Sequence, residues 1–307
     1  GSWGFPSRVR SSYGITHEHV FRIGSGDGFL CAVDPTDPDT VYCESQGGNI
    51  SRVNVRTGAT SRVRRPGQAA GGGRGGRGGG RGGGRGDRNR YRFNWETPFF
   101  LSPHNPHTLY WAGNRVIKSI NRGDVAKEIS GEITRGKRGS ATALAESPHT
   151  EGVLWVGTDD GALWVTRVGG GEWTDVTKNL PALETPRWIS HIEASKTAAG
   201  TAYIVIDGHR SHDFRPHIWK TTDYGDSFED LSAGLPQVST RVLREDPSHP
   251  DVLYVGCEIG VCVSVDAGKS WARLKGNLPT VRVDDILIHP RDQEIVVATH
   301  GRSVWIA

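Results

Sequence analysis

The 307-residue sequence contains no methionine, only four cysteines and no long apolar run. Because natural chains start with methionine and this one starts at Gly1 inside a patterned segment, we expect a fragment or processed piece of a longer protein. No stretch approaches the ~20 apolar residues that a membrane helix requires, so no membrane span is predicted. The sequence also lacks a serine nucleophile elbow, a phosphate-binding glycine loop and a zinc pattern, so nucleophilic catalysis has no support and no cofactor or metal is predicted.

Glycine, tryptophan and short apolar segments are plentiful instead. The sequence has 42 Gly, 10 Trp and 35% hydrophobic residues, a composition typical of many short strands joined by tight turns. A length of 307 residues does not force two domains, because all-β propellers often hold that many in one. We therefore expect an all-β fold over 1–307, forming a single domain or most of one.

One phrase recurs along the chain, an apolar strand, a proline turn and a second apolar strand. It is found at 34–42, 102–110, 147–155, 246–254 and 289–296, with a degenerate copy at 192–206. Repeats of ~40 to 50 residues with four short strands each predict a β-propeller of about six blades, or six to eight in the parent. The predicted blades are 24–65, 91–131, 139–180, 187–236, 237–278 and an incomplete 279–307. Residues 1–23 are expected to complete the last blade by pairing with 303–306.

Two hairpins between the third and fourth strands of a repeat share the pattern S/T-x-D-x-G-x-S/T-W/F. An aspartate in this position braces the turn and the aromatic side chain packs under the blade, so we interpret the pattern as structural rather than catalytic. Ser119 to Asp124 and Thr166 to Trp173 are degenerate copies. The positions of the two full matches are Thr221, Asp223, Gly225 and Phe228, and Ser264, Asp266, Gly268 and Trp271.

Blade topology sorts the loops onto two ends of the strands. The turns between strands two and three share one end with the connections between blades, and we call this the polar end because charged, histidine and tryptophan residues gather there. Such side chains around a funnel are the usual features of a ligand site. The residues predicted to bind ligand are Asp27, Trp95, Glu96, Trp188, His209, Glu258, His300 and Arg302.

Each of these residues also has a plain structural interpretation. Asp27 lies in a glycine-rich turn, and both tryptophans are candidates for the core. His209, His212 and Asp213 favour a solvated loop over a metal site, because they lack a fixed ligand spacing. Carboxylates for glycoside hydrolysis could come from several positions, but sequence does not supply the required separations of ~5 to 10 Å, so no catalytic residue is assigned. The available acids are Asp27, Glu96, Asp159, Asp160 and Glu258.

The four cysteines fall into two hairpins, with Cys31 predicted to face Cys43 and Cys257 to face Cys262. Buried thiols are favoured, with disulfides as the alternative if the protein is exported.

The formal net charge of +3 is concentrated in one segment. Gly67 to Arg90 holds six Arg and one Asp, or +5, which leaves −2 for the remainder. Residues 71–86 are 12 Gly and 4 Arg, so 66–90 is predicted to be a disordered inserted loop. Arg-Gly runs can bind single-stranded nucleic acid, but this run lacks aromatics, and we favour a neutral insertion with nucleic acid as a second alternative.

The sequence resembles the bacterial BNR-repeat propellers of the sortilin N-terminal-like and xyloglucanase-like glycosyl-hydrolase kinds. The resemblance rests on the two hairpins with the S/T-x-D-x-G-x-S/T-W/F pattern, which is the Asp-box of BNR repeats, and on 1–8, 93–98, 219–225, 246–256 and 298–306. It covers nearly all of the chain except 66–90. It implies a secreted, periplasmic or cell-surface protein, often with a second propeller in the same chain. Relatives of the sortilin type bind polypeptides and those of the xyloglucanase type cleave β-glucans, but neither a catalytic pair nor a sialidase arginine triad maps onto a motif here. We expect a module that binds a polypeptide or polysaccharide ligand, with glycoside hydrolysis as the alternative.

Overall fold

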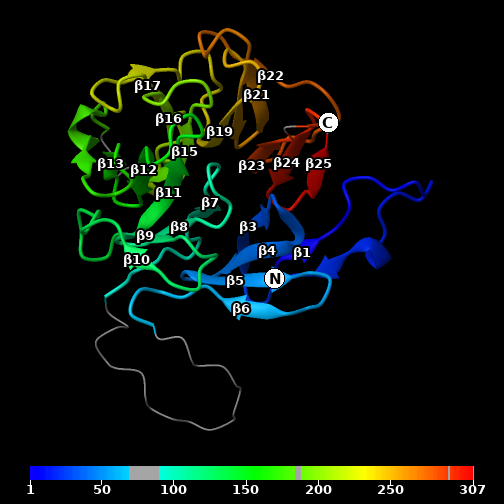
Figure 1. Cartoon of the computed structure of the whole chain (residues 1–307). Helices are drawn as coiled ribbons and strands as arrows, with labels where there is room; N and C mark the ends of the chain where they lie inside the picture. Colours follow the sequence, from blue (N-terminus) through cyan, green and yellow to red (C-terminus); the bar gives the residue numbers. More distant parts are fainter. Residues whose placement is uncertain (69–89, 184–187, 290, 307) are drawn as a thin grey trace. The chain divides into compact units, whose positions relative to one another are not determined.

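The computed structural model describes residues 1–68, 90–183, 188–289 and 291–306 (Figure 1). These residues form strands, loops and three single turns of 3-10 helix, η1 (His17–His19), η2 (Thr177–Asn179) and η3 (His209–Ser211). They belong to two compact units. Unit 1 is Gly1–Ile133 with Arg138–Ala141, and unit 2 is Thr134–Lys137 with Thr142–Ala307. The Gly/Arg segment predicted to be disordered lies, from 69 to 89, outside the described residues.

Unit 1 contains two four-stranded antiparallel sheets, each with its strands in chain order. Tyr42, Leu109 and Trp111, at most 1% exposed, lie in the hydrophobic cluster of this unit. Strands that are buried along most of their length, such as β8, bury both faces of the sheet against neighbouring layers. The first sheet is β3 (Gly28–Asp34), β4 (Asp37–Ser45), β5 (Asn49–Asn54) and β6 (Thr60–Arg62), and the second is β7 (Phe99–Leu101), β8 (Leu109–Ala112), β9 (Val116–Ser119) and β10 (Lys127–Glu128).

The N-terminal segment departs from the prediction. β1 (Trp3–Gly4) pairs with β2 (Phe21–Arg22) in a separate two-stranded sheet. The Ser2 carbonyl accepts the N–H groups of Ile23 and Gly24 at 2.9 and 3.2 Å, which holds this strand on the chain just before β3. The predicted pairing of 1–23 with 303–306 is therefore wrong, because local hydrogen bonds occupy the first strand.

Unit 2 contains four further sheets, again with strands in chain order. The last one has three described strands, as predicted for the incomplete blade 279–307. The sheets are β11 (Ala141–Glu146), β12 (Leu154–Thr158), β13 (Leu163–Thr166) and β14 (Thr174–Asp175); β15 (Ile189–Ala194), β16 (Ala202–Ile206), β17 (Ile218–Thr221) and β18 (Glu229–Asp230); β19 (Thr240–Glu245), β20 (Leu253–Cys257), β21 (Gly260–Ser264) and β22 (Ala272–Arg273); and β23 (Val283–Ile288), β24 (Ile295–Thr299) and β25 (Val304–Ile306).

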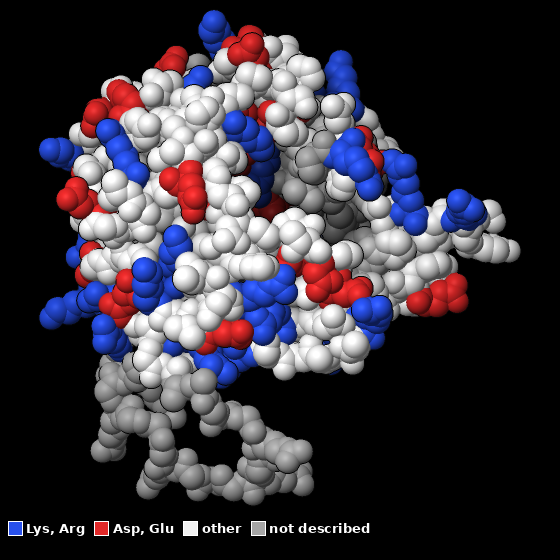
Figure 2. Space-filling view, in the orientation of Figure 1, with Lys and Arg blue, Asp and Glu red and all other residues white. Residues whose placement is uncertain are grey.

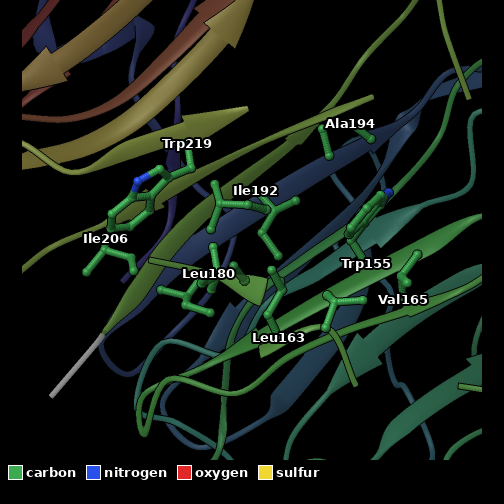
Figure 3. Packing of buried hydrophobic residues seen from close by; sticks show 13 residues of the cluster. Trp155, Leu163, Val165, Leu180, Ile192, Ala194, Ile206 and Trp219 are labelled. Carbon is green, nitrogen blue, oxygen red and sulfur yellow. The ribbon is translucent and has the colours of Figure 1, made fainter. Parts of the chain in front are cut away.

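Successive blades of unit 2 pack through large apolar side chains. Figure 3 shows Trp155 and Leu163 of one sheet beside Ile192 of the next, within one buried cluster. Trp155 and Leu163 are fully buried, and burial of such a side chain stabilises the fold by roughly 1.5 to 3 kcal/mol. Each blade therefore depends on its neighbour to cover a sheet face, as the repeat predicts.

The patterned turns carry a common hydrogen-bond set. The Ser264 hydroxyl donates to Asp266 Oδ1 at 2.7 Å and accepts the Gly268 N–H at 2.8 Å. Asp266 in turn accepts the backbone N–H and the hydroxyl of Ser270. The turn at 221–228 repeats every one of these contacts. The aspartate thus closes the turn with its own carboxylate, and hydrogen bonds from Ser270 hold the pKa of Asp266 down at about 2.

The glycine of each turn also touches the preceding blade. Gly268 has a φ of 91°, and a Cβ there would lie 2.9 Å from Leu231 Cδ1. Trp271 lies over the same residue and donates its indole N–H to the Leu231 carbonyl at 2.9 Å. Only glycine combines this backbone conformation with so close an approach. The same approach recurs at Gly225 against Val176 and at the degenerate copy, Gly123 against Val63.

The cysteine predictions are correct in part. Cys31 pairs directly with Cys43. Cys257 instead pairs with Gly260, and Cys262 pairs with Val255. The turn consists of residues 258 and 259, so the centre of the hairpin lies one residue earlier than predicted. All four are free thiols, of which Cys31 is exposed and the other three are buried.

The predicted fold class is confirmed. The described strands form six antiparallel blade sheets of a β-propeller, five of four strands and one of three, and each lies within its predicted boundaries.

Candidate functional site

Three first strands of unit 2 share an irregularity at the polar end. β15, β19 and β23 lie next to one another, and each shifts register with its partner at its second residue. The extra residues are Ser190, Arg241 and Asp284. A bulge turns the side chain of the extra residue and is common beside binding sites. Two of the three bulged residues carry a charge, so charged groups gather where the three strands begin.

The loop after β16 supplies the first contact. Asp207, 2% exposed, lies 2.5 Å through Oδ1 from His209 Nδ1 and 3.4 Å through Oδ2 from the guanidinium of Arg241. Burial of the carboxylate is offset by this Arg and by the His209 backbone N–H, which donates at 3.2 Å. The pair joins the fourth blade of the chain to the first strand of the fifth.

The next blade repeats the arrangement. Glu258 follows β20 and lies 3.8 Å from the guanidinium of Arg282, which precedes β23. Arg282 Nε donates to Asp284 Oδ1 at 2.7 Å, and Asp284 Oδ2 lies 3.1 Å from His300 Nδ1. The Glu258 N–H donates to the carbonyl of Ser239, two residues before Arg241, so a backbone hydrogen bond connects the two sets of ionic contacts. We call the whole set the rim chain: His209, Asp207, Arg241, Glu258, Arg282, Asp284 and His300.

An aromatic side chain lies at the beginning of the rim chain. The guanidinium carbon of Arg210 is 4.5 Å from the centre of the Trp188 ring, a cation–π contact. The Trp188 carbonyl accepts the Asp207 N–H at 2.9 Å. The loop is braced from behind by buried Asp213, whose pKa is held well below its usual range by Arg215 and then His217. Trp188 is thus fixed beside the ionic groups.

A second ion network lies further along the same three strands. Arg244 of β19 contacts Glu193 of β15 at 3.1 Å and Asp285 of β23 at 2.9 Å, and its Nε donates to the Ile286 carbonyl. Burial works to raise the pKa of Glu193, but His191, Arg244 and Lys196 outweigh it and leave that pKa well below the usual range. The network fixes the first strands below the rim chain.

Three predicted site residues lie in unit 1. The backbone N–H of exposed Asp27 donates to Gln46 Oε1 at 2.9 Å, and the carbonyl of Trp95, 61% exposed, accepts the Gly47 N–H at 3.1 Å. Both therefore touch the turn between β4 and β5. Glu96 neighbours buried Glu44 there.

Glu44 differs from every predicted site residue because it is 1% exposed. Its Oε1 accepts the Gly48 N–H at 3.1 Å, and its Oε2 has no hydrogen-bond partner among the described residues. Burial raises the pKa of Glu44 to about 8, and the neighbouring Glu96 carboxylate adds to the rise while N–H groups lower it. Glu44 is therefore protonated at neutral pH.

The structure thus gathers some of the predicted site residues in each unit. In unit 2, Trp188, His209, Glu258 and His300 belong to the rim chain or touch it. Arg302 is exposed in the turn before β25. The predictions missed Asp207, Arg241, Arg282 and Asp284. An Arg-Val pair at the start of two successive blades, 241–242 and 282–283, was a usable signal for the two arginines. Among the described residues, no three His, Cys, Asp or Glu side chains converge as metal ligands would.

The sequence matches no family model and no curated protein. Solved structures do resemble the chain. An ancestral GH74 enzyme aligns with a TM-score of 0.66 at 13% identity, over 92% of this chain and 36% of its own. The GH74 enzyme of Niastella koreensis aligns at 0.61 and 18% identity, over 89% and 41%. The extracellular domain of a one-component system of B. thetaiotaomicron aligns at 0.60 and 12%, over 91% and 32%.

These identities show the fold alone, and the chain spans about a third to two fifths of the length of those structures. The described helices are single turns, none of which is long and apolar enough to cross a membrane. The comparisons show that this chain shares its β-propeller fold with GH74 enzymes and with the extracellular domain of a one-component system.

Proposed function

We propose that this chain is an exported ligand-binding propeller that recognises a glycan or polypeptide at the rim chain. The observation that carries the proposal is the pair of neighbouring ionic sets, His209 to Arg241 and Glu258 to His300, built on three bulged strands beside Trp188. Charged pairs of this kind are not needed to hold blades together, because apolar clusters already do so. The likeness to an extracellular domain supports export.

Glycoside hydrolysis is the second candidate, supported by the likeness to GH74 enzymes. It requires one carboxylic acid that remains protonated beside a second carboxylate. Among the described carboxyl groups, the one with a raised pKa is Glu44, which is buried and belongs to unit 1. The acids of the rim chain are instead paired with Arg and His side chains. Binding without cleavage is therefore the better supported function.

Nucleic-acid binding has less support. On the face drawn in Figure 2, basic and acidic side chains are interspersed rather than gathered into a region of one sign. A nucleic-acid site is usually a basic patch or stripe. The Arg/Gly run on which this alternative rests lies outside the described residues.

We also infer that the turns at 221–228 and 264–271 are Asp-boxes of the BNR kind, which their shared hydrogen-bond set supports. The sortilin-like and xyloglucanase-like assignments, a second propeller in the parent chain and the extent of the domain over 1–307 remain proposals.

The test is a screen of the chain against plant and bacterial polysaccharides and a peptide set, with binding and new reducing ends measured on the same samples. Glu258→Ala should change the affinity for a ligand found at this site, because it removes one carboxylate of the rim chain. The control is Asp226→Asn, at the opposite end of the strands in an exposed turn. New reducing ends that disappear in Glu258→Ala would show that the function is hydrolysis and not binding alone. Binding that both variants leave intact would reject the rim chain as the site.

A further inference from the structure

The rim chain uses its acceptors internally. Asp207 contacts His209 through one oxygen and Arg241 through the other, and Asp284 likewise contacts Arg282 and His300. Two of its three carboxylates therefore have both oxygens engaged by side chains of the protein. Glu258 is the exception, since it has one contact at 3.8 Å.

Donors, in contrast, face solvent at both ends of the rim chain. Arg210 is exposed on the Trp188 ring, and its guanidinium has no hydrogen bond among the described residues. Arg302 is exposed in the turn next to His300, and within the described part of the chain its side chain has no polar partner. An arginine side chain offers five N–H donors and no acceptor. A ligand must therefore bring acceptors to these positions.

We propose that the ligand of the rim chain is a glycan bearing carboxylates, a chain of uronic acids, held by Arg210 and Arg302. The inference rests on the proposed function and names its substrate class. Carboxylates are the natural partners of guanidinium groups. The Trp188 ring adds an apolar surface beside Arg210 for a sugar ring.

An acidic polypeptide fits the same charges less well. Each peptide unit carries an N–H that needs an acceptor when it is buried. Glu258 is the main acceptor that the rim chain offers such groups, because each oxygen of Asp207 and Asp284 already contacts a side chain of the protein. A sugar hydroxyl can either donate or accept a hydrogen bond. The hydroxyls of a polyuronate can therefore accept from the arginine N–H groups and do not require acceptors from the protein.

The test compares three probes for binding to the whole chain at low ionic strength: polygalacturonate, its methyl-esterified form and poly-L-glutamate. We expect polygalacturonate to bind at least about tenfold tighter than the ester, which has the same backbone without the charges. The double variant Arg210→Gln/Arg302→Gln should weaken that binding roughly five- to twentyfold, as for two exposed charge contacts. Both residues are exposed, so thermal unfolding should be unchanged.

The matched control is Arg291→Gln, an exposed arginine in the turn between β23 and β24 at the opposite end of the strands. It should leave binding within about twofold, since it lies away from the rim chain. A loss in the control as large, per arginine removed, as in the double variant would mean attraction to net charge and would overturn the proposal. Tighter binding of poly-L-glutamate would replace the glycan by an acidic peptide.

Binding of a neutral glycan distinguishes failure of the carboxylate inference from failure of the proposed function. If xyloglucan or the methyl ester binds as well as polygalacturonate and Glu258→Ala abolishes it, the carboxylate inference fails while the rim chain stays the binding site. If Glu258→Ala and the double arginine variant both leave every measured affinity unchanged, the proposed function fails as well.

Discussion

Replacement of Glu44 by glutamine should remove the pH dependence of stability that this residue imposes. Its carboxyl is 1% exposed, one oxygen has no partner among the described residues, and its pKa is raised from an ordinary 4.5 to about 8. At ~1.4 kcal/mol per pKa unit, this difference corresponds to about 5 kcal/mol. Glutamine has nearly the same shape and does not ionise.

The sign follows from linkage. Because the folded pKa lies above the unfolded one, the stabilising effect of the protonated Glu44 is complete below pH 4.5 and is lost progressively as the pH rises to about 8. Glu44→Gln should be slightly less stable than the parent at pH 4.5, since the extra amide N–H costs about 1 to 3 kcal/mol if it is unpaired. It should be more stable by a few kcal/mol at pH 8.5.

The assay is urea unfolding followed by tryptophan fluorescence for both proteins at pH 4.5, 6.5 and 8.5. The quantity to compare is the difference in unfolding free energy between variant and parent, because other titrating groups cancel from it. It should change by up to about 5 kcal/mol in favour of the variant between the extreme pH values. Glu96→Gln in the parent removes the neighbouring like charge. The pH range over which the parent loses the stabilisation from Glu44 should therefore move to lower pH. A difference that is the same at all three values would refute a buried, protonated Glu44.

Three further outcomes test the fold. Gly268→Ala should cost roughly 1 to 3 kcal/mol by urea unfolding, because of its φ of 91° and the contact with Leu231, whereas no loss would mean that the turn relaxes freely. Asp266→Asn should lower the urea midpoint of unfolding at pH 7. Between pH 4 and pH 2 the midpoint of the variant should fall less than that of the parent, because the parent loses the contribution of Asp266, whose pKa is about 2, as this carboxylate is protonated. Arg244→Met should cost about 3 to 5 kcal/mol by leaving Glu193 buried without its Arg, and adding Glu193→Gln should recover part of it in a double-mutant cycle.

The β-propeller class and the blade boundaries could be predicted from the sequence because the information is local. The strand-turn-strand phrase and the patterned hairpins at 221–228 and 264–271 each span about ten residues. The hydrogen bonds of the turn aspartate stay within the hairpin, as between Ser264 and Asp266. The cysteine hairpin shows the limit of this reasoning. A two-residue turn before Gly260 rather than a four-residue one moves Cys257 and Cys262 off direct opposition, and spacing alone does not distinguish the two.

The site depended on contacts that no local pattern contains. Asp207 and Arg241 are 34 positions apart, and their approach follows from the packing of one blade on the next and from a bulge that turns the arginine side chain. Burial decided the state of Glu44 in the same way, because a carboxyl group keeps an ordinary pKa until neighbouring elements exclude water from it. The sequence by itself determined the six blades, the order of their strands and the patterned turns at 221–228 and 264–271, since these depend on neighbouring residues. Only the tertiary structure decided which charges meet and which carboxyl stays protonated, since both depend on what distant segments place around each group.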